Sequence, residues 1–275
     1  MHKNMPAIVD MHCHVLPGLD DGAKTFKQSL NMLRLAAEDG ITTVVATPHL
    51  VFDGSERLFA ARAKSALASL RFLAGSAGLP VKILLGYEVL LSSSLLHAAG
   101  LADYAIEGTG RLLVEALSPQ PAEQLEELLY VLEHNSTGLI LAHPERNEWL
   151  SRHPDYLASL AQRGVLIQVN AGSITGEFGG NVFRSAKRMA ARGLIHLIGT
   201  DAHSDTGRKP EASAAIRMLA DWVGEEEAGR IASGRTEKIL QTAVWPQRDA
   251  FSRQKDRLPA MGPMKYWNRG RPYGC

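Results

Sequence analysis

The sequence has few cysteines, no long apolar run and almost no net charge. Two cysteines in 275 residues exclude a disulfide-stapled scaffold and favour a reducing, cytoplasmic compartment. No apolar run is long enough to cross a bilayer, and residues 1–6 are too polar for a signal peptide. A formal net charge of +1 predicts no general attraction to nucleic acid or to a membrane surface. We therefore expect a cytoplasmic globular protein without membrane insertion.

Several common catalytic and binding motifs are also missing. The chain has no Gly-rich P-loop, no Gly-x-Ser-x-Gly elbow and no zinc-finger spacing. A thiol phosphatase built on Cys13 would need an arginine just after the nucleophile to cradle phosphate, but the position six residues beyond it is Leu19. This excludes cysteine-based phosphate chemistry.

Charge is placed unevenly along the chain. Residues 246–275 carry five arginines and two lysines against two aspartates, a net +5 that leaves −4 for residues 1–245. Four prolines and several glycines interrupt this segment, so we expect a poorly ordered, solvated extension. An arm that attracts phosphate or a partner is the alternative. The sequence thus predicts one domain over 1–245 and a basic, Pro/Gly-rich tail over 246–275.

Apolar, β-rich runs recur seven times in the body of the chain. Continuous apolar runs of this length are typical of parallel strands that are buried on both faces. The runs are Ala7–His12, Thr43–Thr47, Val81–Glu88, Arg111–Glu115, Gly138–Ala142, Val165–Val169 and Ile195–Thr200. Helical patterns separate most of them, and regular alternation of strand and helix predicts an α/β barrel of seven strands.

The helical patterns rest on apolar residues that recur every three or four positions. Phe26, Leu30, Leu33 and Ala37 form one such stripe, which Gly40 closes. Other predicted helices are Ser55–Ser76, a segment around Leu125, Leu128, Leu129 and Leu132, and then Ala212–Trp222, Glu225–Ala232 and Thr236–Leu240.

Histidines and carboxylates gather where the predicted strands end. Strand alternation would place Asp10, His12 and His14 on one face and Met11 and Cys13 on the other, and the same spacing joins Asp201 to His203. The residues at strand ends are His12, His14, His49, Glu88, Glu115, His143, Asp201 and His203. Imidazole and carboxylate ligands suit divalent cations, and barrel enzymes keep their sites at this end of the strands. The pattern predicts a metal site.

Two loops add residues of other kinds. Asp20-Asp21-Gly22 is consistent either with a simple turn or helix cap, or with an aspartate that reaches back to a metal. Arg146 and Arg208 closely follow His143 and His203. Two arginines at the rim of one metal site indicate recognition of an anionic group, because guanidinium binds phosphate bidentately.

Five short motifs together resemble the polymerase and histidinol phosphatase (PHP) superfamily. They are His12-x-His14, Thr47-Pro48-His49, Gly86-Tyr87-Glu88, Ala142-His143-Pro144-Glu145-Arg146 and Thr200-Asp201-Ala202-His203. Asp20-Asp21-Gly22-Ala23 and the sequence around Glu115 are similar to the CpsB-type bacterial protein-tyrosine phosphatases of capsule and exopolysaccharide operons. The resemblance spans roughly Ile8 to Leu240.

The resemblance implies a distorted (β/α)7 TIM-like barrel, the PHP fold, with three divalent metals, usually manganese, with iron or zinc as alternatives. One metal would be held by His12, His14, Glu88 and Asp201, and Glu88 would bridge to a second that Glu115 and His143 also hold. Asp21, His49 and His203 would hold the third, and Arg146 and Arg208 would grip the phosphoryl group. Asp10 would support the ligands from behind.

The activity implied is hydrolysis of phosphotyrosine by a metal-bridged hydroxide, on a bacterial tyrosine kinase that controls polysaccharide export. Asp205 and Glu145 are the candidates for a general acid. One alternative is a small-molecule phosphatase of the histidinol-phosphate kind, and another is a non-catalytic module that binds partners. An amidohydrolase barrel ranks last, because Lys82 lies at the wrong end of its strand to bridge metals.

Overall fold

The computed structural model describes residues 7–119, 121–134, 137–234 and 239. The predicted basic tail, 246–275, lies outside the described residues, as does the predicted helix Thr236–Leu240 apart from Ile239.

The described chain has nine strands where seven runs were predicted, because the third run is divided into β4 and β5 and because β3 lies just beyond the second run, Thr43–Thr47, and was not predicted. Thr47-Pro48 separates β2 from β3, and Gly86-Tyr87 separates β4 from β5. The strands are β1 (Ile8–Cys13), β2 (Ile41–Ala46), β3 (His49–Leu50), β4 (Lys82–Leu85), β5 (Glu88–Leu90), β6 (Arg111–Glu115), β7 (Gly138–Ala142), β8 (Leu166–Asn170) and β9 (Leu197–Gly199). Proline has no N–H to donate, so the break between β2 and β3 at Pro48 has a direct cause.

The strands form two parallel sheets that join into one barrel. The sheet orders are β1-β2-β4 and β3-β5-β6-β7-β8-β9. Backbone hydrogen bonds from Gly86 N to Ala46 O (2.8 Å) and from Glu88 N to Pro48 O (3.1 Å) connect the two sheets where the strands are interrupted. At the other edges, Asp201 N donates to His12 O at 2.7 Å, which joins β9 to β1. The prediction of a distorted seven-stranded α/β barrel is therefore confirmed.

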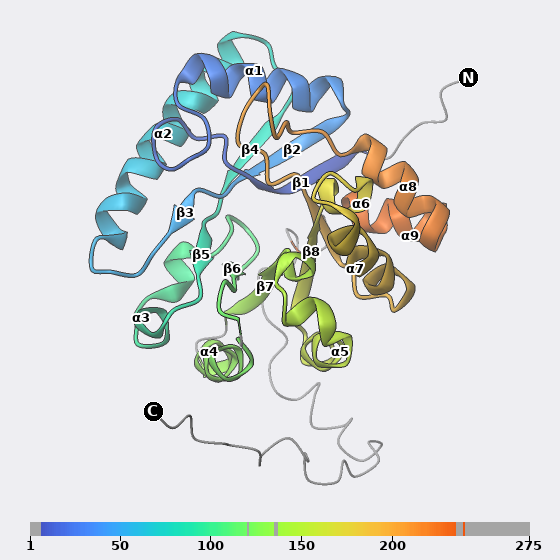
Figure 1. The fold of residues 1–275 in the computed structure, drawn as a ribbon. Coiled ribbons are helices and arrows are strands. Elements are labelled where there is room, and N and C mark those ends of the chain that lie inside the picture. Colours follow the sequence, from blue (N-terminus) through green and yellow to red (C-terminus); the bar gives the residue numbers. More distant parts are fainter. Residues whose placement is uncertain (1–6, 120, 135–136, 235–238, 240–275) are drawn as a thin grey trace, which may run out of the picture. The chain divides into compact units, whose positions relative to one another are not determined.

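Helices surround the strands on the outside (Figure 1). They are α1 (Phe26–Glu38), α2 (Glu56–Ser76), α3 (Ser93–Leu96), α4 (Ala122–His134), α5 (Pro154–Gln162), α6 (Ala171–Thr175), α7 (Gly180–Ala191), α8 (Ser213–Val223) and α9 (Glu225–Gly229). Leu125 and the other predicted leucines of α4 are buried, as expected. In α1 the buried face is instead centred on Met32 and Leu33, and Phe26 is exposed.

Buried apolar residues divide into an outer and an inner cluster. The outer cluster lies between strands and helices, and the inner one fills the barrel with side chains such as Val45, Leu113 and Ile140. Met11 belongs to the inner cluster, whereas Cys13 belongs to the outer one. The prediction that these two residues share a face is wrong, because the register of β1 shifts between Asp10 and Cys13.

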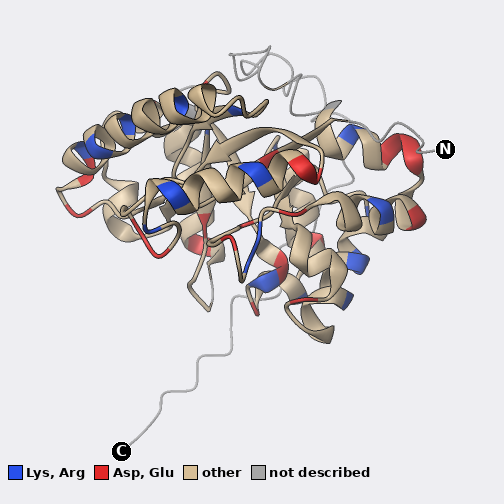
Figure 2. Cartoon of the chain, turned by 90° about the horizontal axis from the view of Figure 1, so that it is seen from above, with Lys and Arg blue, Asp and Glu red and all other residues tan. Residues whose placement is uncertain are grey.

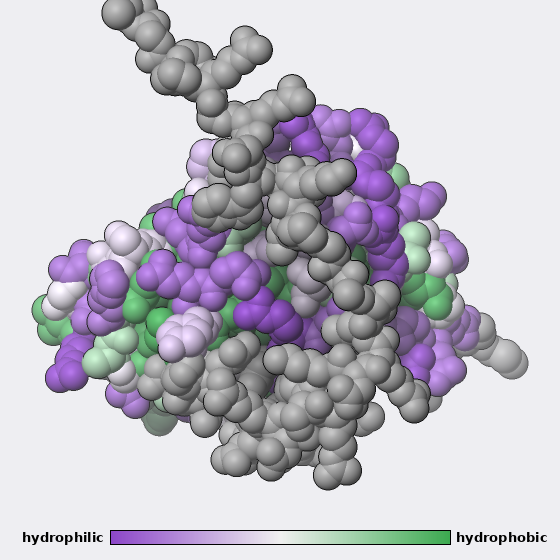
Figure 3. Space-filling model, turned by 90° about the horizontal axis from the view of Figure 1, so that it is seen from below, coloured by the Kyte–Doolittle hydropathy of each residue, from purple (hydrophilic) through white to green (hydrophobic). Residues whose placement is uncertain are grey.

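The surface carries charges of both signs. Figure 2 shows lysine and arginine interspersed with aspartate and glutamate along the helices seen from above. On the face that Figure 3 presents, polar residues surround smaller apolar areas in the described part of the chain. None of the described helices is both long and apolar enough to cross a membrane.

We expect Ile140→Ala to lower the free energy of unfolding by about 2–5 kcal/mol, because it opens a cavity inside the barrel. Ile140 is 0% exposed. Urea denaturation followed by circular dichroism measures the effect. Leu58→Ala is the control, since Leu58 is 69% exposed on α2 and its loss should cost no more than about 0.5 kcal/mol. Equal effects of the two substitutions would contradict the assignment of the inner core.

Candidate metal centre

The structure gathers the predicted ligand-type residues at one end of the barrel. Most lie at or just after the carboxyl end of a strand, and parallel strands bring those ends to a common edge. His49 and Glu88 instead begin the short strands β3 and β5, and Asp21 lies in the loop after β1. Five imidazole rings cluster there, with centroids of neighbouring rings 4.0–5.3 Å apart for His14–His203, His14–His49, His12–His14 and His12–His143. The His12 and His143 rings are stacked, and the other three pairs are tilted.

Glu88 lies at the centre of this cluster. Its carboxylate is 1% exposed, and four imidazoles approach it. Oε1 is 2.8 Å from His143 Nε2. Oε2 is 2.9 Å from His49 Nδ1, 3.2 Å from His12 Nε2 and 3.3 Å from His14 Nε2. Nevertheless Oε2 receives no hydrogen bond of acceptable geometry. A buried carboxylate oxygen that faces three ring nitrogens without a hydrogen bond fits a place for a shared cation.

The electrostatics of the cluster lead to the same conclusion. Burial acts to raise the pKa of Glu88, but the charge of His12 and the hydrogen bond with His143 outweigh it and hold that pKa well below its usual range. Burial would likewise lower the pKa of His14, yet Asp20, Asp201 and Glu88 raise it. The carboxylates thus favour protons on nearby imidazoles, and a divalent cation would displace those protons on binding.

The two aspartates of the Asp20-Asp21 pair have different roles. Asp20 Oδ2 lies 2.8 Å from His14 Nδ1 and accepts from His49 N at 3.1 Å. Burial acts to raise the pKa of Asp20, but hydrogen bonding to His14 prevails and lowers it to about 2. Asp21 is 67% exposed, with Oδ1 3.3 Å from His203 Nε2 and 3.4 Å from His49 Nε2. Asp20 therefore orients a histidine, and Asp21 reaches the open side of the cluster.

His12 and Asp10 are fixed by groups on neighbouring strands. His12 Nδ1 lies 3.1 Å from Gln168 Oε1 on β8. A Cβ on Gly199 would lie 2.5 Å from the Cβ of His12, so only glycine leaves room for this histidine. Asp10 accepts from Thr200 N at 2.8 Å and from Thr200 Oγ1 at 2.6 Å. Asp10 thus ties β1 to the segment that leads into Asp201, and burial raises its pKa to about 6.

Asp201 is held between the imidazoles and the two arginines. Its Oδ1 is 3.5 Å from His14 Nε2. Oδ2 accepts from Arg146 Nη1 at 2.6 Å and from Asn170 Nδ2 at 2.8 Å, and it forms an ion pair with Arg208. Burial acts to raise the pKa of Asp201, but the charge of His12, with His14, His143 and Arg208, holds it far below its usual range.

The backbone is strained at two of these residues. Asp201 has φ of +54° and His143 has φ of +30°, a region that non-glycine residues rarely adopt. Asp201 also lies two residues beyond β9, so the prediction that strand alternation aligns it with His203 is wrong. Both side chains nevertheless reach the cluster, with His203 Nδ1 3.6 Å from Asp201 Oδ1.

The side chains fall into four overlapping groups that could each hold a cation. The groups are His14, Asp21, His49 and His203; His12, Glu88 and His143; His12, His14 and Asp201; and His49, Glu88 and Glu115. All nine predicted ligands belong to at least one group. The groups differ from the predicted ligand sets in two ways. His14 lies with Asp21, His49 and His203. Glu115 lies with His49 and Glu88, and its Oε1 is 3.7 Å from His143 Nε2.

The two candidate general acids are engaged elsewhere. Glu145 is 2% exposed, and its Oε1 accepts from Ser173 Oγ at 2.6 Å and from Asn170 N at 3.0 Å. It therefore caps the start of α6. Asp205 accepts from Asn31 Nδ2 at 2.9 Å and so ties its loop to α1. In this structure both carboxylates have structural partners.

Three residues of this region were missed by sequence reasoning. Gln168 and Asn170 are polar residues two apart at the end of a buried strand, a signal of the same kind as His12-x-His14. Phe178 contacts Arg146 and Arg208 and lies in a loop after α6, where no sequence pattern marks it.

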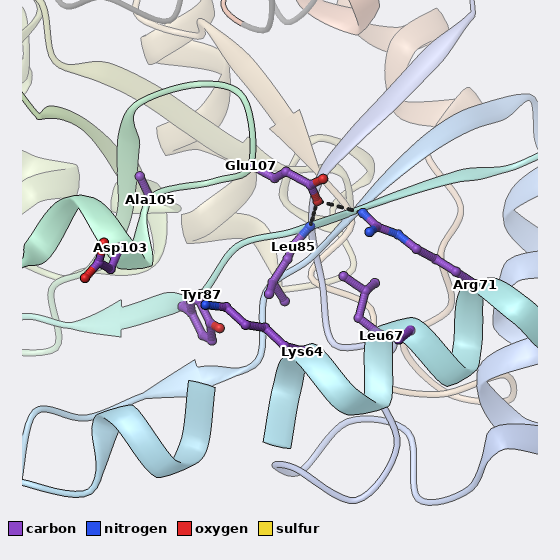
Figure 4. A pocket seen from close by; sticks show the side chains of 9 residues that line it. Lys64, Leu67, Arg71, Leu85, Tyr87, Asp103, Ala105 and Glu107 are labelled. Carbon is purple, nitrogen blue, oxygen red and sulfur yellow. Dashed lines mark hydrogen bonds and ion pairs between the residues drawn. The ribbon is translucent and has the colours of Figure 1, made fainter. Parts of the chain in front are cut away.

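A separate pocket of about 350 Å³ lies beside α2, and none of the ligand-type residues lines it. Figure 4 shows Arg71 and Leu85 N bonded to Glu107 at its wall, next to Leu67 and Tyr87. It lies outside the cluster described above.

Comparison with known families identifies the chain. The family model described as "Capsular polysaccharide synthesis, CpsB/CapC" matches residues 8–241. The fold and the cluster define an α/β barrel with a candidate metal centre, and the chain belongs to the CpsB/CapC family.

Curated relatives cover most of the chain. The tyrosine-protein phosphatase YwqE of Bacillus subtilis is 29% identical over 220 residues, which is 80% of this chain and 86% of the relative. The putative tyrosine-protein phosphatase CapC of Staphylococcus aureus is 31% identical over 204 residues, 73% of this chain and 79% of the relative.

Comparison with solved structures agrees with the family assignment. A chain from the crystal structures of YwqE from Bacillus subtilis and CpsB from Streptococcus pneumoniae, described as metal-dependent tyrosine phosphatases, matches with a TM-score of 0.74 and 27% identity, covering 86% of this chain and 96% of that one. A dihydropyrimidinase from Brevibacillus agri matches with a TM-score of 0.54 and 13% identity, covering 87% of this chain and 72% of that one, which shows a shared fold only.

We expect Asp20→Asn to weaken divalent-metal binding about 10- to 100-fold, because it removes the carboxylate that orients His14. Calorimetric titration of the metal-free protein with Mn²⁺ measures the affinity. Asp221→Asn, at an exposed position of α8, is the control and should bind normally. Unchanged affinity in Asp20→Asn would show that this carboxylate does not support the centre.

Proposed function

We propose that the chain is a metal-dependent protein-tyrosine phosphatase that acts on phosphotyrosine of a bacterial tyrosine kinase in capsule or exopolysaccharide synthesis. The observation that carries the proposal is Asp201, whose two oxygens face the imidazole cluster and two arginines respectively. Asp201 therefore contacts both the histidines that would hold a metal and the arginines that would bind phosphate. The names of the relatives YwqE and CapC support the substrate class.

The cluster has enough donors for three divalent cations, and Mn²⁺ is the metal that we propose. His12, His14, Glu88 and Asp201 would hold one, and Glu88, Glu115 and His143 a second. Asp21, His49 and His203 would hold the third. Cations bound there lower the pKa of water and neutralise negative charge on a phosphoryl group.

The protein's own groups prepare the substrate for attack. Arg146 and Arg208 meet at Asp201 Oδ2, and a phosphoryl group placed beside them would offer oxygens for bidentate hydrogen bonds. These bonds strengthen as charge builds on the equatorial oxygens in the transition state. Tyrosine leaves as a phenolate with only modest help from a proton donor, which agrees with the engagement of Glu145 and Asp205 in structural bonds.

We propose that the protein acts in the cytoplasm. The small number of cysteines supports this, because thiols stay reduced there.

We also propose that residues 1–245 form the catalytic domain and that the basic segment 246–275 is an extension that catalysis does not need.

Hydrolysis of a phosphotyrosine peptide, compared with histidinol phosphate, tests the activity. We expect a clear preference for the peptide, loss of activity after chelation and recovery with Mn²⁺. A His12→Ala, His14→Ala variant should retain less than about 1% of the activity, because it removes two ligands of the centre. Preference for histidinol phosphate would replace the proposed substrate, and full activity of the double variant would refute the metal mechanism.

Removal of either arginine is expected to lower kcat/KM about 100-fold or more, the usual cost of losing a group that stabilises transition-state charge. Arg208→Ala tests this, since alanine removes both the charge and the planar fork. Arg152→Ala is the control, because Arg152 is 70% exposed and pairs only with Glu148 among the described contacts. Steady-state kinetics on the phosphopeptide give both values. Equal activity of the two variants would exclude Arg208 from phosphoryl recognition.

A further inference from the structure

One aromatic ring contacts both arginines of the centre. The Cζ atom of Arg146 lies 4.7 Å from the ring centroid of Phe178, and that of Arg208 lies 5.6 Å from the same centroid. A guanidinium within about 6 Å of an aromatic centroid is attracted by the electrons of the ring. Both guanidiniums also pair with Asp201 Oδ2, so the ring and the carboxylate hold the same two cations.

We propose that Phe178 is a positioning residue for Arg146 and Arg208, and that it keeps the two guanidiniums aimed together at the phosphoryl site. This inference rests on the proposed function, which supplies the phosphoryl group that the arginines bind. Phe178 itself does not act on the reacting atoms.

The two arginines need such a support because they come from separate segments. Arg146 ends a short 3-10 turn after β7, and Arg208 lies in the loop after β9, where its carbonyl accepts from His203 N at 2.9 Å. Their side chains are 35% and 31% exposed, so solvent alone would leave them several rotamers. A flat ring that contacts both reduces that freedom without competing for their hydrogen-bond donors.

The backbone around Phe178 fixes the ring in place. Glu177 N donates to Gly172 O at 2.8 Å, which folds the loop back onto α6. A Cβ on Gly172 would lie 2.8 Å from Cε2 of Phe178, so the ring packs directly against the backbone of α6. Gly176, with φ of +86°, makes the turn that this return requires.

The helix that precedes the ring, α6, is anchored beside Arg146. Glu145, the residue before Arg146, accepts from Ser173 Oγ and from Asn170 N at the start of α6. The position of Phe178 is thereby linked to the segment that carries Arg146. This link is expected of a built support and not of an incidental contact.

Simple packing is the competing explanation, since Phe178 is only partly buried. The two explanations differ for Phe178→Leu, which keeps apolar volume but removes the electrons that attract a cation. They also differ when the arginines are absent, because a positioning residue then has nothing to position.

The test compares Phe178→Leu and Phe178→Trp with the wild type, each loaded with Mn²⁺. Two quantities are measured: kcat/KM on the phosphotyrosine peptide and the Kd of inorganic phosphate by calorimetry. For Phe178→Leu we expect about a tenfold loss in both, with metal content unchanged, and near-normal values for Phe178→Trp. In an Arg146→Ala, Arg208→Ala background, Phe178→Leu should cause no further loss.

Phe183→Leu is the matched control, because Phe183 is also partly buried but packs on Trp222, with ring centroids 5.5 Å apart. It should keep wild-type values. Gly172→Ala gives a second route, since the added methyl group would lie within 3 Å of Glu177 Oε2 and of Phe178 Cε2 and must displace both side chains. The same loss of phosphate affinity is expected.

Wild-type values for Phe178→Leu, or an equal loss in the background without arginines, would overturn the inference. A wild-type protein that does not hydrolyse phosphotyrosine would instead refute the proposed function. The Kd of inorganic phosphate would still decide the role of Phe178 in that case, so the two failures are distinguishable.

Discussion

The buried Glu88 carboxylate, surrounded by four imidazoles, is the interaction on which this end of the barrel depends. A carboxylate that is 1% exposed is costly to bury, and only nearby positive charge offsets that cost. The imidazoles come from β1, from β3 and from the residue after β7, so the charge can be compensated only when the strands meet in their native order. Strand order and site chemistry are therefore determined together.

Asp201 extends this arrangement to the phosphate side. One of its oxygens faces the histidines and the other faces Arg146, Arg208 and Asn170. The left-handed backbone at Asp201 makes this double contact geometrically feasible, and Asp10 and Thr200 hold the segment that leads into it. Strain of this kind is retained at functional sites because the surrounding bonds over-determine the conformation.

Much of the fold followed from local patterns. Each of the seven predicted apolar runs contains a strand of the barrel, because a strand buried on both faces must be apolar at nearly every position, whereas the two-residue strand β3 was not predicted. The predictions that failed concern backbone irregularities. Met11 and Cys13 face different clusters because the register of β1 shifts, and Phe26 is exposed because the buried face of α1 is centred on Met32 and Leu33. Neither a register shift nor a small rotation of a helix leaves a mark in hydrophobic periodicity.

The sequence by itself determined which residue types end each strand, and hence that histidines, carboxylates and two arginines would gather at one end of a barrel. The tertiary structure alone decided which neighbours each of these side chains contacts. It places Asp20 beside His14, Gln168 beside His12, and Phe178 against Arg146 and Arg208. These pairings join residues from different strands and loops, and their distances depend on how the whole barrel closes. Spacing along the chain carries no information about such contacts.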